Sequence, residues 1–356
     1  MTAHLLSSFL SELSPAQTPG YAWSVSTPAG RLAGGFGGSR IVEPTRAPVE
    51  ESTLFDLASL TKPLTTALIA LRAFDAGQLD LEAPVAATGR PPFTLLDLLR
   101  HEAGFPDWLP LYGCAPSPAA LKPWLLRECP REERAGLRAV YSCAGYVLLG
   151  MLLEEGLGAP MEQLFERYVS IPLGLPPGEA CFSPPAAWRH RCAAEELDGE
   201  YEARMAHPFG ATPPPFRSGM AWGEVHDGNA RFLGGAAGNA GLFGTLAAVE
   251  RLCRAFSPQD RFLSPEALRL AWESPRSEGR HRTAGWKAVG SEGWWANALL
   301  HEGGIGHEGF TGTGAWMEPE TARTYILLTN RIHPRHPGTD FGRVRAAFLK
   351  AAKELQ

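Results

Sequence analysis

Ser59 and Lys62 combine the residue types and the spacing that nucleophilic catalysis needs. They lie where a helical pattern begins, and Pro63 suits the first turn of that helix. Residues three apart share one helix face, so the two side chains are expected to meet. A serine hydroxyl is a weak nucleophile near neutral pH, and a lysine desolvated in a cleft can take its proton. The alternative is a helix-capping serine followed by an exposed lysine, and the pattern alone does not separate the two interpretations.

Six segments, in the same order along the chain, resemble the motifs of one superfamily. They are residues 57–63, 98–106, 141–150, 223–227, 235–243 and 306–313, and they are spread over most of the chain. The superfamily contains the class C β-lactamases, the D,D-peptidases and the family VIII esterases. The resemblance implies a β-lactamase/transpeptidase-like fold in which Ser59 attacks an ester or amide carbonyl, Lys62 acts as its proton acceptor, and water cleaves the acyl-enzyme.

Tyr141 matches the tyrosine of the superfamily's Tyr-x-Asn motif. The resemblance implies that a nearby ammonium pushes this phenol toward phenolate, so that it relays a proton. Without the motif order, Tyr141 would be interpreted as a core tyrosine. Cys143 stands where the motif usually has Asn or Asp, and a thiol is a weak hydrogen-bonding group. This departure puts amide-bond and β-lactam chemistry in doubt and favours esters.

The run His307-Glu308-Gly309 resembles the third motif, on the strand that edges the cleft. The resemblance implies that His307 hydrogen-bonds the tyrosine or the substrate, and that the amides of Phe310 and Ser59 form an oxyanion hole. Gly309 is expected to let a ligand approach the strand closely. Glu308 replaces a hydroxyl residue that usually helps to hold a substrate carboxylate, so it is expected to repel anions unless the strand turns it away.

Apolar periodicity and turn residues predict an α+β protein. The expected elements, in chain order, are a helix over 5–13, a hairpin of 21–26 and 31–36, a strand ending near residue 55, a helix over 62–76, helices between 95 and 256, a long irregular segment over 172–234, strands over 286–300, 312–318 and 324–330, and a helix over 344–352. We expect residues 1–59 and 276–356 to form a sheet lobe with terminal helices and residues 60–275 a mainly helical lobe. The active site would lie between the two lobes.

The composition indicates which classes of binding partner and which cellular location to expect. The 356 residues carry a formal charge of −5, which gives no basic field for nucleic acid. Apolar residues make up 44% and charged residues 20%, as in a folded globular protein. The start of the chain lacks the features of a secretory signal, and no apolar stretch is long enough to span a membrane, so a cytoplasmic location is expected.

Neither a metal nor another cofactor is expected. His301 and His307 lie six apart among glycines, which does not fit the helical His-Glu-x-x-His spacing. The six cysteines include no Cys-x-x-Cys pair, so we expect free thiols.

The function expected from the sequence is that of a carboxylesterase acting on small neutral esters. The alternatives are a D-amino-acid peptidase or weak β-lactamase, and a non-hydrolytic scaffold or binding protein. The sequence carries no signal for an oligomeric state.

Overall fold

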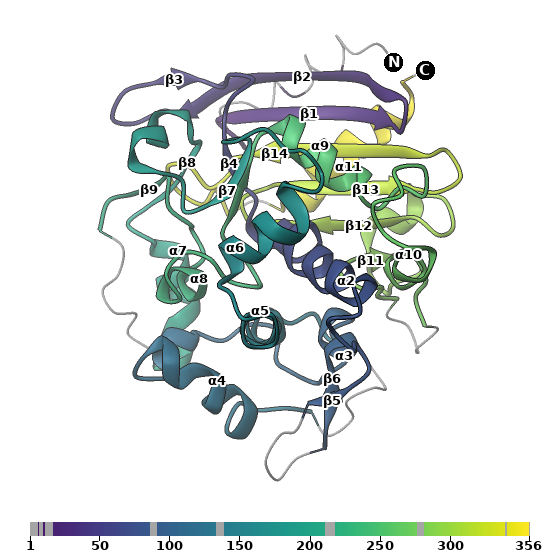
Figure 1. Ribbon diagram of the computed structural model, residues 1–356. Helices are drawn as coiled ribbons and strands as arrows, with labels where there is room; N and C mark the ends of the chain where they lie inside the picture. The colour runs from purple at the N-terminus through teal and green to yellow at the C-terminus, as the bar shows by residue number, and fades with distance from the viewer. Residues whose placement is uncertain are drawn as a thin grey trace.

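A seven-stranded antiparallel sheet, built from both ends of the chain, forms one layer of the protein. The computed structural model describes residues 6, 10, 17–85, 91–132, 139–210, 218–275, 281–338 and 340–355. The strand order is β11-β12-β13-β14-β1-β2-β3, so β1 from the start of the chain pairs with β14 from its end. Figure 1 shows these strands above a lobe of helices.

The sheet strands are β1 (Gly20–Thr27), β2 (Gly30–Ile41), β3 (Ala47–Pro48), β11 (Lys287–Ala288), β12 (Ile305–Glu308), β13 (Gly314–Glu318) and β14 (Arg323–Thr329). Short strands elsewhere are β4 (Phe55–Asp56), β5 (Pro84–Val85), β6 (Phe93–Thr94), β7 (Ala180–Phe182), β8 (Ala194–Leu197), β9 (Met220–Trp222) and β10 (Leu242–Gly244). The α-helices are α2 (Leu68–Asp75), α3 (Leu95–Leu99), α4 (Pro118–Arg127), α5 (Cys143–Leu157), α6 (Met161–Phe165), α7 (Glu200–Ala206), α8 (Gly228–Phe232), α9 (Leu246–Arg254), α10 (Pro265–Trp272) and α11 (Phe341–Lys353).

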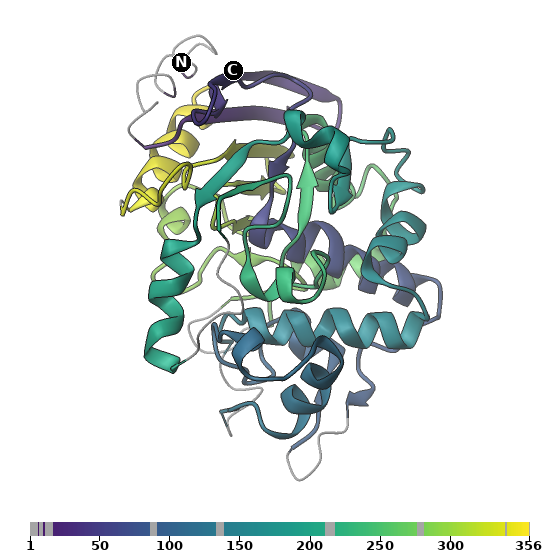
Figure 2. The same cartoon turned by 90° about the vertical axis from the view of Figure 1, so that its left-hand side faces the viewer.

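Strand alternation divides the apolar residues of the sheet between two cores. On one face, Trp23 of β1 and Trp316 of β13 pack against Phe348 of α11. On the other face, neighbouring residues such as Ala22 and Ile326 join the larger core that includes α2, α5 and α9. The sheet therefore lies between α11 and the helical part of the molecule (Figure 2).

The helix that carries the candidate nucleophile runs through the larger core. A 3₁₀ turn, Ala58–Leu60, leads into a π-helical stretch, Lys62–Ala67, which continues as α2. All six residues of the π-helical stretch are buried, and π-helical turns are frequent at functional sites. Local sequence thus places Ser59 at the start of a buried helix, as predicted.

The predicted hairpin, the helix after Ser59 and the closing helix are confirmed. One expectation was wrong. The expected strand over 286–300 is only β11 followed by turns and a 3₁₀ helix, because Gly290 and Gly293 adopt positive φ values of 98° and 66°. The irregular segment expected over 172–234 is correct only in part, because its loops connect the short elements β7, β8, β9, α7 and α8.

Other expectations were tested only in part. Leu6 and Leu10 are helical and buried, while the rest of the expected 5–13 helix lies outside the described residues. The lobe boundaries at residues 59 and 276 stay a prediction. Among the described helices, none is both long and apolar enough to cross a membrane.

Candidate active site

Lys62 contacts Ser59 from below the cleft. Its side chain is fully buried, and its ammonium donates to Ser59 Oγ at 2.9 Å, to the carbonyl of Asn239 at 3.0 Å and to Cys143 Sγ at 3.6 Å. Three acceptors match the three donors of an ammonium group, which a buried charge requires. The predicted Ser59–Lys62 contact is therefore present in the structure.

Tyr141 approaches the same oxygen from another side. Its hydroxyl donates to Ser59 Oγ at 2.8 Å, and its ring lies 5.0 Å from Lys62 Nζ. Burial raises the pKa of Tyr141 well above its ordinary value, and the nearby Cys143 acts in the same direction. The expectation of a phenolate is therefore not supported, because desolvation outweighs the hydrogen bond with Ser59, which acts in the opposite direction. Tyr141 is a neutral phenol that donates to the nucleophile.

Cys143 begins α5 within this cluster. Ser142 caps the helix by accepting from the Gly145 amide at 2.9 Å, which places the Cys143 side chain in the first turn. The sulfur lies 3.6 Å from Lys62 Nζ and 3.8 Å from the Tyr141 hydroxyl. Burial raises the pKa of the Cys143 thiol, so it is a neutral group at pH 7. It occupies the predicted position without the hydrogen-bonding capacity of an amide.

His307 presents one unpaired nitrogen at the site. Its Nδ1 lies 3.1 Å from the carbonyl of Glu308, so Nδ1 carries the proton and Nε2 keeps a lone pair. Nε2 is buried and has no partner among the described residues. Burial, reinforced by the charges of Lys62 and Arg282, holds the pKa of His307 well below its ordinary value. His307 is therefore a neutral acceptor, and its ring centre lies 5.9 Å from that of Tyr141.

Glu308 and Gly309 both line the cleft, as predicted. The Glu308 carboxylate accepts from the indole of Trp294 at 2.9 Å, which fixes it at the cleft wall. Burial lowers the pKa of Arg345 to about 10, while Glu308 opposes that shift through its attraction for the guanidinium. Because a cation balances Glu308, the expected repulsion of anions does not follow from its charge alone. A Cβ on Gly309 would lie 2.1 Å from Thr313 Oγ1 and 2.7 Å from the Leu57 carbonyl, so this glycine permits close packing behind the nucleophile.

Phe310 is the residue whose amide was predicted to complete the oxyanion hole. It directly follows Gly309, and within the described residues its amide meets no hydrogen-bond acceptor. The ring is held among aromatic neighbours, with centroids 5.5 Å from His226 and 5.0 Å from Tyr201. Arg331 lies over the ring and donates from Nε to the Phe310 carbonyl at 2.8 Å. These contacts hold Phe310 at the cleft wall.

All the predicted site residues meet at one cleft, with a volume of 560 Å³. Seven of them line it, namely Ser59, Tyr141, Cys143, His307, Glu308, Gly309 and Phe310, and Lys62 lies beneath Ser59. The helical lobe supplies most of the lining that sequence reasoning missed, including Asp107, Trp108, Tyr201, Glu202 and Met205. Asp107 and Trp108 directly follow the 98–106 motif, so that motif was the available signal for these two residues. The others are brought in by tertiary folding.

Arg282 is the most informative of the missed residues. Its guanidinium lies 5.3 Å from the centre of the Tyr141 ring and lines the cleft. Among the described residues, no carboxylate forms an ion pair with it. Burial lowers the pKa of Arg282, while Tyr141 and Glu308 act in the opposite direction. The cleft wall therefore contains, beside the Tyr141 ring, a guanidinium that forms no ion pair with a described carboxylate.

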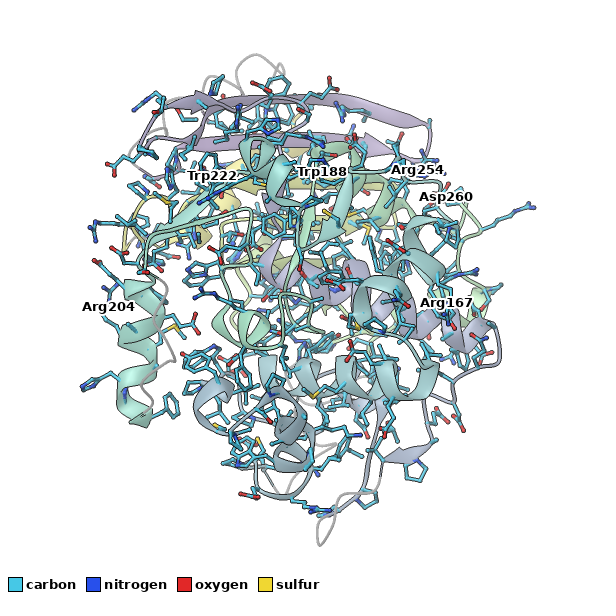
Figure 3. All side chains as sticks on the ribbon, turned by 60° about the vertical axis from the view of Figure 1, so that its left-hand side comes forward. Arg167, Trp188, Arg204, Trp222, Arg254 and Asp260 are labelled. Carbon is cyan, nitrogen blue, oxygen red and sulfur yellow. The ribbon has the colours of Figure 1, made fainter. Side chains whose placement is uncertain are left out.

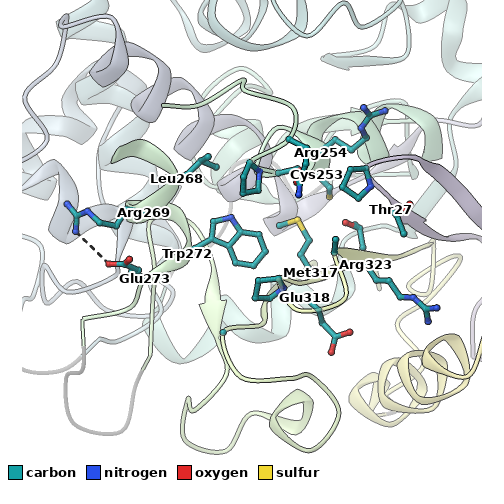
Figure 4. A pocket seen from close by; sticks show the side chains of 18 of the residues that line it. Thr27, Cys253, Arg254, Leu268, Arg269, Trp272, Glu273, Met317, Glu318 and Arg323 are labelled. Atoms are coloured by element: carbon teal, nitrogen blue, oxygen red, sulfur yellow. Dashed lines mark hydrogen bonds and ion pairs between the residues drawn. The ribbon is translucent and has the colours of Figure 1, made fainter. Parts of the chain in front are cut away.

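A second cavity, of 430 Å³, lies between α10 and the β13–β14 turn (Figure 4). Leu268, Trp272 and Met317 give it apolar walls. Arg254 at its rim forms an ion pair with Asp260, with 3.0 Å between Nη2 and Oδ1. Both residues are labelled in Figure 3. Its walls do not include the serine, lysine and tyrosine of the first cleft, so the first cleft is the candidate active site.

In the part of the chain that the structure describes, no group of three His, Cys, Asp or Glu side chains is arranged to hold a metal ion.

A single family model covers nearly the whole sequence. The model described as Beta-lactamase matches residues 9–348. The chain belongs to the β-lactamase family. The resemblance inferred from the motifs and the predicted fold class are thereby confirmed, and the protein is a member of a family of serine hydrolases.

Relatives within and around the β-lactamase family differ in activity. A putative D-alanyl-D-alanine carboxypeptidase of Escherichia coli K12 is 27% identical over 329 residues, which are 84% of this chain and 73% of the relative. The solved structure of EstCE1, a hydrolase with promiscuous acyltransferase activity, is 20% identical with a TM-score of 0.74, covering 98% of this chain and 99% of that one. An octameric penicillin-binding protein homologue from Pyrococcus abyssi is 20% identical with a TM-score of 0.72, covering 100% and 79%. At these identities the structural likeness establishes the shared fold.

Proposed function

We propose that this β-lactamase-family protein hydrolyses carboxylic esters through an acyl-enzyme on Ser59. The observation that carries the proposal is the convergence of Lys62 and Tyr141 on Ser59 Oγ, at 2.9 and 2.8 Å. In its unprotonated form, Lys62 takes the serine proton as Oγ bonds to the carbonyl carbon. The Ser59 and Phe310 amides hold the oxyanion, and Tyr141 passes a proton to the departing alkoxide and recovers one from Lys62. Water then attacks the acyl carbon and gives a proton to Lys62; the bond from that carbon to Ser59 Oγ breaks, Oγ takes the proton back from Lys62, and the acid is released.

Cys143 supports ester over amide substrates. Cleaving an amide requires a well-placed proton donor for a poor leaving group, and the position that usually holds an amide side chain here holds a neutral thiol. An alkoxide leaves with less assistance than an amine. The preference for neutral esters rested on the charge of Glu308. Because the Glu308 carboxylate attracts the guanidinium groups of Arg282 and Arg345, the proposal does not require a neutral substrate.

Arg282 favours a second candidate, a D-amino-acid carboxypeptidase. A guanidinium without an ion-pair partner, half-buried at a cleft wall, suits a substrate carboxylate. The named activity of the Escherichia coli relative, a putative D-alanyl-D-alanine carboxypeptidase, points the same way. The two candidates differ in the bond that is cleaved and in the need for a free carboxylate.

The deciding experiment compares three substrates with the purified protein. They are the p-nitrophenyl half-ester of succinic acid, its methyl-capped analogue, and an acetylated peptide ending in D-alanyl-D-alanine. We expect both esters to be turned over and the peptide to be cleaved far more slowly. Peptide turnover with a kcat/KM equal to that of the esters would replace the esterase proposal by the carboxypeptidase one.

Arg282→Gln tests the role of the cation in the same assay. If Arg282 binds a substrate carboxylate, the variant loses kcat/KM on the half-ester by about tenfold relative to the capped ester, the value of one charge-assisted hydrogen bond. Arg269→Gln, at the rim of the second cavity, is the matched control and should leave the ratio unchanged. An unchanged ratio in Arg282→Gln means that the cation does not select the substrate.

A further inference from the structure

The carboxylate of Asp56 lies directly behind the nucleophile turn. Its side chain is fully buried. One oxygen accepts from the Ala58 amide at 2.8 Å, and the other accepts from the His226 amide at 2.8 Å. Asp56 thus joins the turn that precedes Ser59 to the segment of His226 and Asp227, which also lines the cleft. Nothing in the proposed proton transfers uses this carboxylate.

Asp56 also connects to the second half of the oxyanion site. Its carbonyl accepts from the Thr311 hydroxyl at 2.7 Å, and Thr311 directly follows Phe310. The ring of His226, whose amide Asp56 holds, stacks on the Phe310 ring with centroids 5.5 Å apart and planes 16° apart. Glu196 fixes that imidazole through a 3.0 Å contact to Nε2. Two independent routes therefore lead from Asp56 to Phe310.

The turn that Asp56 holds is strained. Ala58 has a φ of 45°, a left-handed conformation that is unfavourable for residues with a Cβ. Strain of this kind persists only where the surrounding structure determines it. The Ala58 amide is the group that the Asp56 carboxylate binds, and Ala58 immediately precedes the Ser59 amide. Without this hydrogen bond, we expect the turn to relax to a less strained conformation.

We propose that Asp56 is a positioning residue that fixes the Ser59 and Phe310 amides relative to each other, so that both can bind the oxyanion. The inference rests on the proposed acyl-enzyme function and adds to it a residue that touches no substrate. The carboxylate is suited to this task because it only accepts hydrogen bonds, and its two oxygens are matched to two backbone donors. An asparagine of the same shape can satisfy only one of them.

Asp56→Asn tests the proposal against a matched control, Asp75→Asn. Asp75 ends α2 and accepts from both the amide and the hydroxyl of Ser264, at 2.9 and 2.5 Å, outside the cleft. Rates are normalised to the fraction of molecules that a fluorophosphonate labels at completion. We expect Asp56→Asn to lower kcat by about 100-fold with little change in KM, as small misplacements of catalytic groups do. The affinity for phenylboronic acid, which forms a tetrahedral adduct on serine, should fall in parallel.

The control separates positioning from stability. Asp75→Asn should reduce the folded fraction while leaving normalised kcat and boronate affinity at wild-type values. Wild-type values in Asp56→Asn would overturn the proposal. If Asp56→Asn does not fold, Thr311→Val removes only the hydroxyl that reaches the Asp56 carbonyl, with an expected loss in kcat of about tenfold. Unchanged kcat in that variant overturns the proposal too. A wild-type protein that is neither labelled nor active would instead reject the proposed function.

Discussion

Tyr141 and Tyr146 both turn their rings toward Lys62, but only Tyr141 reaches the nucleophile. The ring centres lie 5.0 and 5.8 Å from Lys62 Nζ. The Tyr141 hydroxyl donates to Ser59 Oγ at 2.8 Å, whereas the Tyr146 hydroxyl donates to the carbonyl of Leu99 at 2.8 Å. The same residue type in almost the same environment thus has a catalytic position in one case and a structural position in the other.

This difference gives the first prediction. Tyr141→Phe should lower kcat by about 10²- to 10⁴-fold, the usual contribution of a positioned proton donor, while the protein stays folded. Tyr146→Phe should instead lower the free energy of unfolding by about 1 kcal/mol, because the Leu99 carbonyl loses one of its two donors and keeps the Gly285 amide, and should leave kcat near the wild-type value. Steady-state ester hydrolysis and urea denaturation of both variants measure the two effects. Equal losses of kcat would show that Tyr141 has no special role.

Cys143→Asn should shift the substrate preference toward amides. Asparagine restores a donor and an acceptor beside Lys62, so kcat/KM for an anilide should rise relative to that for the ester of the same acid. One hydrogen bond to a charged group is worth about 1.5 kcal/mol, which corresponds to roughly a tenfold change in this ratio. Cys143→Ala is the control, because it removes the sulfur without adding an amide. A ratio that moves equally in both variants would contradict the prediction.

Two buried histidines predict how stability depends on pH. Burial lowers the pKa values of His101 and His307 well below 6.5 in the folded protein. Below pH 6.5 the unfolded chain therefore binds more protons than the folded one, so stability should fall as the pH decreases from about 6.5 toward the lowered values. Each histidine contributes a slope of up to about 1.4 kcal/mol per pH unit. Urea denaturation of wild type and His307→Gln across this range should give a smaller slope for the variant. Parallel slopes would show that His307 titrates normally.

The sequence was sufficient for the site residues that belong to local motifs. Ser59 and Lys62 meet because they are three residues apart at a helix start, and Pro63 and the apolar pattern mark that helix. The β1–β2 hairpin was equally predictable, since two strand-like runs flank a four-residue turn that contains Pro28 and Gly30. In both cases a short stretch of chain contains all the relevant interactions.

Other features of the site depend on tertiary contacts, which a local sequence pattern does not predict. Arg282 lies over Tyr141, and the two residues are far apart in the sequence. The Asp56 carboxylate accepts from an amide 170 residues away, and nothing in the composition of its segment indicates that partner. The phenolate expected for Tyr141 was wrong for a related reason. Charge favours ionisation, but the degree of burial, which is a tertiary property, decides the sign of the pKa shift.

The central claim is that Ser59 is the nucleophile, and covalent labelling tests it most directly. The protein is incubated with a fluorophosphonate and digested, and the modified peptide is sequenced by mass spectrometry. We predict one adduct, on Ser59, and its absence from Ser59→Ala, which should remain folded because alanine costs at most about 2 kcal/mol at a helix start. Ser142→Ala, which alters the serine that caps α5, should still be labelled on Ser59. Labelling of folded Ser59→Ala at the wild-type rate, or an adduct on another residue, would contradict the account.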